Sequence, residues 1–176
     1  MIGYAAMTAI LAAVDQGAKY WIDQQEAEGF PRPVKHTKDR VWLYHNQNRG
    51  FPFGFLKEQE KLVRTLPLVL ISGLGGIFCY LLPKKGHRAE KLGLSLLLGG
   101  AVSNLIDRYW RGYVVDYVNL RFGWMKKVVL NLGDILVALG SLLLLTAQIA
   151  GDAKEALAAK KEQKAAISVN KMENIC

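Results

Sequence analysis

Residues that form disulfides or bind metal ions are scarce in this sequence. Among 176 residues there are two cysteines and three histidines. Cys79 lies inside an apolar segment and Cys176 is the last residue, so we expect no structural disulfide between them. His36, His45 and His87 do not have the short spacing that is typical of metal ligands. The sequence therefore indicates neither a disulfide-stabilised scaffold nor a metal-dependent site.

A basic segment at the start of the chain is also missing. No lysine or arginine precedes Lys19, whereas a cleaved signal peptide begins with a positively charged region. We therefore expect the apolar residues 1–22 to stay in the protein as a membrane anchor. No serine lies in the Gly-x-Ser-x-Gly pattern of a nucleophile elbow, and no nucleic-acid-binding motif is visible. These absences argue against a serine hydrolase of that type and against nucleic acid as a partner.

Long apolar segments are what the sequence does contain. Hydrophobic residues make up 51% of the chain, and uncharged apolar runs alternate with polar stretches. The first run, residues 1–22, would form about 33 Å of helix, which matches the hydrocarbon core of a bilayer. We predict an all-α membrane protein with four transmembrane helices, at approximately residues 1–22, 65–82, 92–107 and 128–150. They would form one membrane domain, residues 1–150, followed by a charged cytoplasmic tail, residues 151–176.

Basic residues outnumber acidic residues in this chain, 23 to 15. The formal net charge is +8, and the basic residues cluster between the apolar runs, so they suit an anionic membrane surface. Four spans place both termini on the same side of the membrane. Residues 83–91 include four Lys or Arg among nine residues, which favours the cytoplasmic side for this loop and for both termini. The two aromatic-rich connections, residues 23–64 and 108–127, would then lie outside.

Asp15 and Lys19 are unusual residues for a membrane segment. They lie four residues apart near the end of the first run, so a helix places them on one face with the acid on the favourable N-terminal side. One interpretation is an ion pair at the membrane interface, with side chains that extend toward water. The other is that the two residues help to line a site near the membrane surface. The sequence leaves both interpretations open.

Further acidic and amide residues lie near the ends of the third and fourth runs. Asn104 and Asp107 end the third run, Asn131 and Asp134 open the fourth, and Asp116 lies between them. Such residues are costly to keep in a membrane and indicate a functional site. Two carboxyl groups that face each other in a partly dehydrated site cannot both ionise easily, so one keeps its proton. We predict that Asp116 and Asp134 form such an acid–base pair, which activates water for attack on a peptide carbonyl.

The connections between the apolar runs contain strand-like and turn-like segments. Residues 41–44 and 113–118 are rich in β-branched and aromatic residues, which favours strands. In residues 48–56, a glycine or proline occupies every second position from 50 to 54, so this segment cannot form a regular helix. Its aromatic residues suit the interface between lipid and water, where the loop would either anchor in headgroups or cover the site.

Five short motifs, in the same order along the chain, resemble those of the bacterial lipoprotein signal peptidases, also called signal peptidase II. The matching residues are Asp15, Gln16 and Lys19 for Asp-Gln-x-x-Lys; Asn48, Gly50, Phe53 and Gly54 for Asn-x-Gly-x-x-Phe-Gly; Gly99, Gly100, Ala101, Asn104, Asp107 and Arg108 for Gly-Gly-Ala-x-Gly-Asn-x-x-Asp-Arg; Val114, Val115 and Asp116 for Val-Val-Asp-Phe; and Asn131 and Asp134 for Asn-x-Ala-Asp. Each motif alone is weak, whereas five in register over most of the chain are specific.

The resemblance implies a specific activity. Members of this family are aspartic endopeptidases of the bacterial cytoplasmic membrane, and they cut prolipoproteins just before a cysteine that carries a diacylglyceryl group. Asp116 and Asp134 would be the catalytic pair near the extracytoplasmic face, with no metal or organic cofactor. The partners would be diacylglyceryl-modified prolipoproteins and membrane lipids, and no nucleic acid.

The resemblance also implies supporting residues and a fold. Asp15 and Lys19 would support the site from the first helix. Residues that would shape the site or hold the substrate backbone are Asn48, Gly50, Gly54, Gly100, Asn104, Asp107, Arg108 and Asn131. The family fold adds a small extracytoplasmic β-cradle and a short interfacial helix to four transmembrane helices, which suits the strand-like residues 41–44 and 113–118.

Several positions depart from the family motifs. Ser103 replaces a glycine, Tyr117 replaces the phenylalanine after the first acid, and Gly133 replaces the alanine before the second. Because all three remain small or aromatic, we expect them to change packing more than activity. Phe51 and Pro52 occupy positions that are usually small in the family turn, which leaves the conformation of this turn open.

Two other classes of protein use acidic residues inside a membrane. Presenilin-like proteases need a Gly-x-Gly-Asp motif, and Asn131 stands at its first position here, so this class is excluded. The alternative is a small polytopic transporter whose buried carboxylates relay protons or bind cations. A transporter does not require the glycine-rich turn or the pairing of asparagine with aspartate, so the peptidase is the preferred interpretation.

Overall fold

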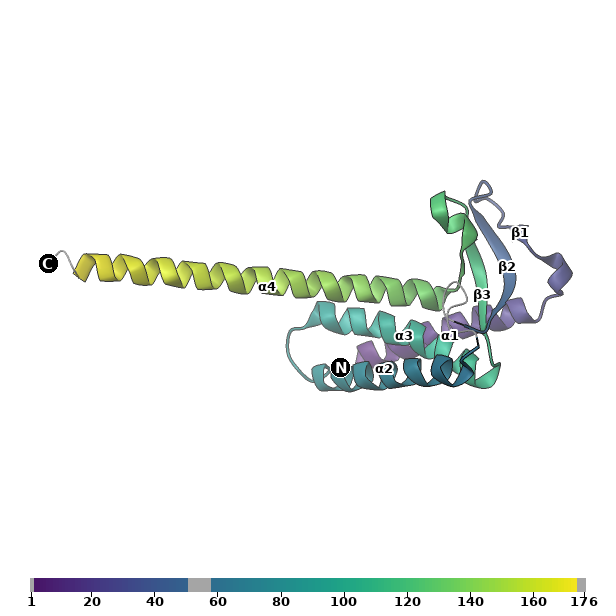
Figure 1. Cartoon of the computed structure of the whole chain (residues 1–176), viewed down its shortest axis with the longest axis horizontal. Helices are drawn as coiled ribbons and strands as arrows, with labels where there is room; N and C mark the ends of the chain where they lie inside the picture. The colour runs from purple at the N-terminus through teal and green to yellow at the C-terminus, as the bar shows by residue number, and fades with distance from the viewer. Residues whose placement is uncertain (1, 51–57, 174–176) are drawn as a thin grey trace.

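The structure is a computed structural model that describes residues 2–50 and 58–173. Within these residues the chain forms four α-helices and a four-stranded antiparallel sheet (Figure 1). The helices are α1 (Ile2–Asp23), α2 (Glu60–Leu81), α3 (Arg88–Trp110) and α4 (Leu132–Glu173). The strands, in their order across the sheet, are β1 (Arg32–Pro33), β2 (Val41–Asn48), β3 (Val114–Leu120) and β4 (Val129–Leu130). The short 3₁₀ segments η1 (Ala27–Gly29) and η3 (Gly123–Lys127) lie in the connections.

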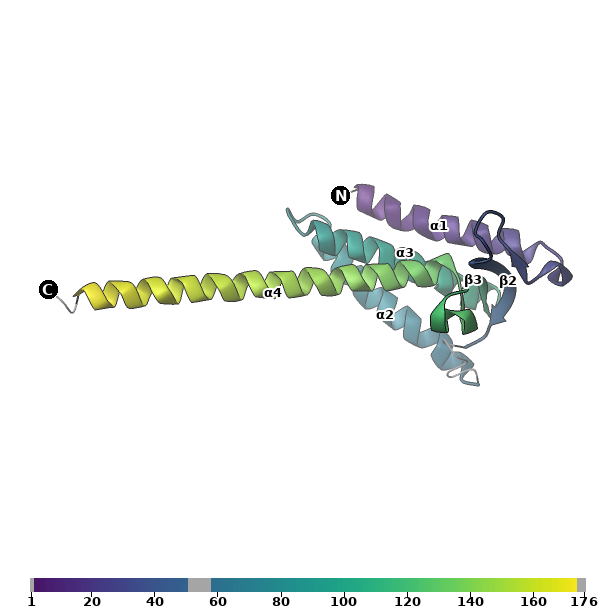
Figure 2. The same ribbon diagram turned by 90° about the horizontal axis from the view of Figure 1, so that it is seen from above.

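Helix α3 is the central helix of the bundle and contacts α1, α2 and α4 (Figures 1 and 2). Glycines allow two of these contacts to be close. A methyl group on Gly99 would lie 3.1 Å from the carbonyl oxygen of Thr8 in α1. One on Gly93 would lie 3.1 Å from the carbonyl oxygen of Gly140 in α4. Small residues therefore bring the helix backbones together, as they do between helices packed in membranes.

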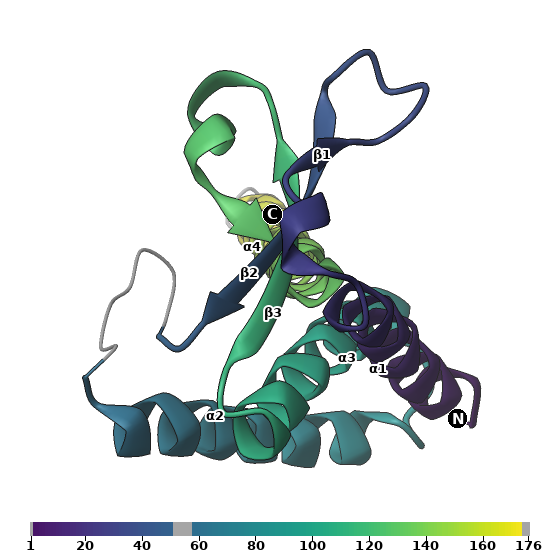
Figure 3. The same cartoon turned by 90° about the vertical axis from the view of Figure 1, so that its right-hand side faces the viewer.

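The sheet lies across one end of the bundle, and its strands run crosswise to the helices (Figures 1 and 3). Both chain termini lie on the side of the bundle away from the sheet (Figure 1). The long strands β2 and β3 pair with Asn48 opposite Val114 and Asn46 opposite Asp116. Because neighbouring residues of a strand face opposite sides, the side chains of Asp116 and Tyr117 point away from each other.

The two predicted strands are confirmed. Residues 41–44 lie in β2 and residues 114–118 lie in β3, with Tyr113 directly before it. Burial explains the strand-forming pattern of the second segment, since Val114 and Val115 are almost completely buried. The predicted turn is described only as far as residue 50, and Phe51 and Pro52 lie outside the described residues.

Helix α4 differs from the apolar run of residues 128–150 at both ends. It begins at Leu132, because Val129–Leu130 pair with β3 and Asn131 caps the helix. It continues to Glu173, since the residues after 150 are rich in alanine, lysine and glutamate, which have high helix propensity. The tail predicted after residue 150 is therefore helical over its described part.

Two of the described helices are long and apolar enough to cross a membrane. The stretches are Lys61–Leu81 in α2 and Leu132–Lys160 in α4, and most of their residues are not buried within the protein. Helices α1 and α3 do not meet the same criterion. Both carry charged residues inside the bundle, among them Asp15, Lys19 and Asp107. Hydropathy and length alone thus support two spans among the described residues.

Candidate active site

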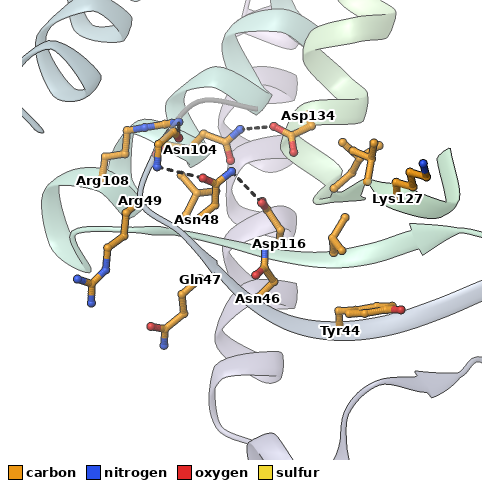
Figure 4. A pocket seen from close by; sticks show the side chains of 15 residues that line it. Tyr44, Asn46, Gln47, Asn48, Arg49, Asn104, Arg108, Asp116, Lys127 and Asp134 are labelled. Atoms are coloured by element: carbon orange, nitrogen blue, oxygen red, sulfur yellow. Dashed lines mark hydrogen bonds between the residues drawn. The ribbon is translucent and has the colours of Figure 1, made fainter. Parts of the chain in front are cut away.

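A cavity of about 500 Å³ opens where the sheet meets the ends of α3 and α4 (Figure 4). Both predicted catalytic acids line it, Asp116 from β3 and Asp134 from the first turn of α4. The cavity is also lined by four of the predicted supporting residues, which are Asn48, Gly50, Asn104 and Arg108. The fold therefore brings together predicted site residues that are far apart in the sequence.

The start of α4 holds Asp134 through a capping box. The side-chain oxygen of Asn131 accepts a hydrogen bond from the backbone N–H of Asp134 (2.8 Å). In return, Asp134 Oδ2 accepts one from the backbone N–H of Asn131 (3.1 Å). This reciprocal arrangement satisfies two donors at the helix start. It also fixes the position of the Asp134 carboxyl group beside the cavity.

The same asparagine connects the two acids. Its side-chain amide donates to Oδ1 of Asp116 (2.8 Å). Asn48 donates to Oδ2 of Asp116 (3.1 Å), and Asn104 donates to Oδ1 of Asp134 (2.9 Å; Figure 4). Each of the four carboxylate oxygens therefore accepts an amide N–H. The hydrogen bonds hold both acids in fixed orientations.

The surroundings of Asp116 raise the pKa of its carboxyl group to about 6. Burial is the main cause, and the negative charge of Asp134 adds to it. Hydrogen bonds from Asn131 and Asn48, together with the charge of Lys19, act in the opposite direction. A carboxyl group with this pKa can accept or donate a proton near neutral pH.

Lys19 lies inside the bundle behind the cavity, and not at a surface. Its side chain and that of Asp15 have no solvent exposure, so the interpretation as a snorkelling ion pair is wrong. The ammonium group lies 2.7 Å from Asp15 Oδ2 and 3.1 Å from Asp107 Oδ2. It also donates to Oδ1 of Asn104 (2.7 Å). Lys19 thus orients the amide group that binds Asp134.

Asp107 connects the end of α3 to strand β3. Its Oδ2 accepts a hydrogen bond from the backbone N–H of Val115 (3.2 Å), the residue before Asp116. Its Oδ1 accepts one from the side chain of Gln16 (2.9 Å), and the guanidinium group of Arg111 pairs with the same oxygen. Asp107 therefore supports the strand that carries the first acid.

Arg108 and Gly50 form the edge of the cavity next to β2. Arg108 donates to the carbonyl oxygen of Gly50 (3.2 Å), and the backbone N–H of Gly50 donates to the side-chain oxygen of Asn48 (3.0 Å). These bonds keep the amide group of Asn48 directed at Asp116. Gly54, which the family motif also includes, lies outside the described residues.

Gly100 allows α3 to approach the first turn of α4. A methyl group at this position would overlap the carbonyl oxygen of Gly133, the residue before Asp134. Glycine is therefore required here by the close approach of two backbones. The close packing at Gly100 therefore helps to set the distance between α3 and Asp134.

Two residues have contacts that the family motifs do not predict. The Tyr117 hydroxyl donates to Asp15 Oδ1 (3.0 Å) and accepts a hydrogen bond from the backbone N–H of Leu132 (3.2 Å). Ser103 donates to Asp15 Oδ2 (2.6 Å). Burial and the charge of Asp15 raise the pKa of the Tyr117 hydroxyl, so it keeps its proton. The only signal in the sequence was that both residues depart from the motifs, which does not identify their partner.

The chain is similar to known proteins over most of its length. A protein-family model described as signal peptidase (SPase) II matches residues 7–150. The lipoprotein signal peptidase of Clostridioides difficile is 30% identical over 141 residues, which cover 80% of this chain and 90% of that protein. The lipoprotein signal peptidase of Burkholderia multivorans is 32% identical over 143 residues, which cover 81% of this chain and 84% of that protein.

Solved structures share the fold. Two bacterial membrane enzyme structures, which are 21% and 22% identical in sequence to this chain, match it with TM-scores of 0.74 and 0.70. The matches cover 88% and 84% of this chain, and 92% and 93% of the solved chains. At this level of identity the likeness concerns the fold alone.

Proposed function

Because the chain belongs to the signal peptidase II family, we propose that it removes signal peptides from prolipoproteins. The bond cut would be the one before a cysteine that carries a diacylglyceryl group, and Asp116 and Asp134 would be the catalytic pair. The observation that carries this proposal is the cavity lined by both acids, with Asn131 bound to each of them. Neutral amide groups are suited to holding two catalytic acids in place, because they orient the carboxyl groups without exchanging protons with them.

Two carboxyl groups in one small cavity can work as acid and base. Their charges repel, so one group keeps its proton while the other is ionised. The ionised group takes a proton from a water molecule, and the water oxygen attacks the carbonyl carbon of the scissile peptide bond. The protonated group gives its proton to the carbonyl oxygen, so a neutral tetrahedral diol forms.

The same pair then completes the cleavage. The group that took a proton from water passes it to the departing nitrogen. The other group takes a proton back from a diol hydroxyl as the carbon–nitrogen bond breaks. The products are a signal peptide with a new carboxyl end and a cysteine with a free amino group. Both acids return to their starting protonation states.

We place the protein in the bacterial cytoplasmic membrane, with α1 to α4 as four spans. Helices α2 and α4 are apolar enough by themselves. The buried charges of α1 pair inside the bundle, and its exposed residues include Ile2, Ile10 and Val14, so this helix can also face lipid. With both termini cytoplasmic, the sheet would form an extracytoplasmic cradle. Residues 1–150 would be the peptidase domain and residues 151–176 a cytoplasmic tail.

The location of the cavity suits a lipid-modified substrate. The cavity lies beside the sheet, at the ends of helices that would span the membrane. A diacylglyceryl group in the bilayer would keep the scissile bond near the membrane surface, at the level of the two acids. A precursor without this lipid would lack the anchor.

A pair of matched substrates tests the proposal. The purified protein in proteoliposomes is incubated with a diacylglyceryl-modified precursor and with its unlipidated twin. We expect only the modified precursor to be cut, directly before the modified cysteine, as measured by mass spectrometry. No cleavage of either substrate, or equal cleavage of both, would contradict the proposal. Ion flux into the same liposomes without precursor would support the transporter alternative.

Asn48→Ala is expected to shift the pH dependence of cleavage. Activity should rise with pH through an apparent pKa of the acid pair, because the base must be ionised. The hydrogen bond from Asn48 stabilises ionised Asp116, so its loss raises the pKa of Asp116 and moves the rising limb to higher pH. A hydrogen bond to a charged group worth about 1.5 kcal/mol corresponds to a shift of about one pH unit.

The measurement is kcat/KM for the lipid-modified precursor across the pH range in which the protein stays folded. Wild type and Asn48→Ala are compared in the same lipid. If the rising part of the pH profile of Asn48→Ala stays where it is in wild type, or moves to lower pH, then Asn48 does not stabilise the ionised base.

A further inference from the structure

The end of the sheet that lies away from α2 carries a dense set of basic residues (Figure 3). Residues 34–40 connect β1 to β2 and residues 121–128 connect β3 to β4, so both connections lie at this end. Together they contain six lysine or arginine residues and one acidic residue, Asp39. The six basic residues are exposed, and they are Lys35, Lys38, Arg40, Arg121, Lys126 and Lys127. We call these two connections the basic tips.

The basic tips project sideways from the helices. Viewed along the axis of α4, both tips lie outside the outline of α1, α3 and α4 (Figure 3). The 3₁₀ segment η3, in the second tip, lies beside the first turns of α4 in both side views (Figures 1 and 2). With the four helices across a membrane, as proposed, this position is the layer of lipid headgroups next to the protein. Phe122 is 56% exposed there, and aromatic residues suit this layer.

The positive charges of the tips are not neutralised within the described part of the chain. The backbone N–H of Arg121 donates to the carbonyl oxygen of Arg40 (2.8 Å), directly beyond the pair of Val41 and Leu120. Two arginines therefore stand next to each other on neighbouring strands, and like charges so placed repel. Arg121 lies over the ring of Trp42, 3.8 Å from its centroid. None of the six basic side chains pairs with a described carboxylate, so an external anion would offset the repulsion.

The location of this charge identifies the anion. Both chain termini lie on the side of the bundle away from the sheet, so cytoplasmic termini place the tips outside (Figure 1). Lysine and arginine are usually concentrated in cytoplasmic loops, which makes a basic extracytoplasmic surface unusual. Anionic phospholipids supply negative charge at the level of the tips, and they attract basic residues within about a Debye length of the membrane surface.

We propose that the basic tips bind the headgroups of anionic phospholipids and hold the sheet against the membrane surface. The inference rests on the proposed membrane location. Lys127, at the end of η3, also lines the active-site cavity. Lipid bound at η3 therefore holds one edge of the cavity at the membrane surface, where a lipid-anchored precursor arrives.

Photo-crosslinking tests this contact without the use of cleavage. The full-length protein is placed in phosphatidylcholine proteoliposomes that contain a small fraction of a probe, either phosphatidylglycerol or phosphatidylcholine with a diazirine near the headgroup. After irradiation and pepsin digestion, mass spectrometry measures the labelling of each peptide. We expect the phosphatidylglycerol probe to label the tip peptides at least about five-fold more, the enrichment that one basic residue near an anionic surface gives.

Two matched variants show whether the basic side chains are the cause. Lys35→Gln/Lys126→Gln removes one charge from each tip, and its tip peptides should lose most of the excess labelling. The control, Lys85→Gln/Lys154→Gln, removes two exposed lysines at the other end of the helices and should keep the tip labelling of wild type. Both variants should keep the unfolding midpoint of wild type, because all four side chains are exposed.

Peptides from residues 62–70 of α2, which carry exposed leucine and valine side chains, are the internal reference and should be labelled equally by both probes. Equal labelling of the tips as well would overturn the inference and leave an acidic segment of the precursor as the alternative occupant. Excess labelling that the tip variant retains would also overturn it. If neither probe labels α2, the proposed membrane location fails, and this inference fails with it. Failure of the protein to cleave a precursor would contradict the proposed function only.

Discussion

Replacing Asp116 or Asp134 with Asn is expected to lower the rate of precursor cleavage by about 10³-fold, within the range that general acid–base catalysis contributes. An amide can neither take a proton from water nor supply one to the carbonyl oxygen. In the proposed mechanism each carboxyl group makes its own proton transfers, and the other group cannot make them in its place, so either change alone stops the reaction cycle. Cleavage of a lipid-modified precursor by the purified variants measures the effect.

Stability has to be measured beside activity in these variants. Asp116 accepts hydrogen bonds on both oxygens, from Asn131 and Asn48, so an amide group in its place would turn N–H toward one of these donors. We expect a lower unfolding midpoint but a folded protein. Asp39→Asn is the matched control, because Asp39 is exposed between β1 and β2 and should not affect cleavage. Near wild-type cleavage by Asp116→Asn or Asp134→Asn would reject the catalytic pair.

Lys19→Met is expected to destabilise the folded protein by about 3–5 kcal/mol, the usual cost of removing one partner of a buried ion pair. The ammonium group of Lys19 contacts the buried carboxylates of Asp15 and Asp107. Methionine has a similar length but no charge. Asp107 would keep its pairing with Arg111. Asp15 would remain buried, and among the described residues its side-chain donors would be the hydroxyl groups of Ser103 and Tyr117. The thermal unfolding midpoint of the purified protein measures the loss.

Two further variants show whether the lost charge is the cause. Lys85→Met changes an exposed lysine between α2 and α3, so its midpoint should equal that of wild type. Combining Lys19→Met with Asp15→Asn removes the unpaired charge as well, and it should recover part of the lost stability. A midpoint for Lys19→Met equal to that of wild type would contradict the role of Lys19 as a buried counter-charge.

Local sequence patterns predict most of the fold, including the residue at which α4 begins. The apolar runs predict the helices, because burial and lipid contact both require apolar residues at helical spacing. Hydropathy alone extends the fourth apolar run through Val129–Leu130, although these residues pair with β3. Asn131 and Asp134 have the spacing of a capping box, and this spacing indicates a helix start at Leu132.

The site could be predicted as a set of residues, but not as a set of contacts. The spacing of Asp15 and Lys19 predicts an ion pair on one helix, and this pair is confirmed. Their third partner, Asp107, is contributed by another helix. Tyr117 is 102 positions from Asp15, so no local pattern links the two. Such contacts depend on how α1, α3 and β3 pack, which single-sequence patterns do not specify.

The most direct test of the central claim, that two acids act as one unit, is the residual cleavage rate of the double variant Asp116→Asn/Asp134→Asn. It is measured with the lipid-modified precursor beside both single variants. If one proton-transfer system contains both carboxyl groups, the double variant should cleave as slowly as either single variant, within about two-fold. A double variant in which the two single losses multiply would contradict the account, because each acid would then contribute independently.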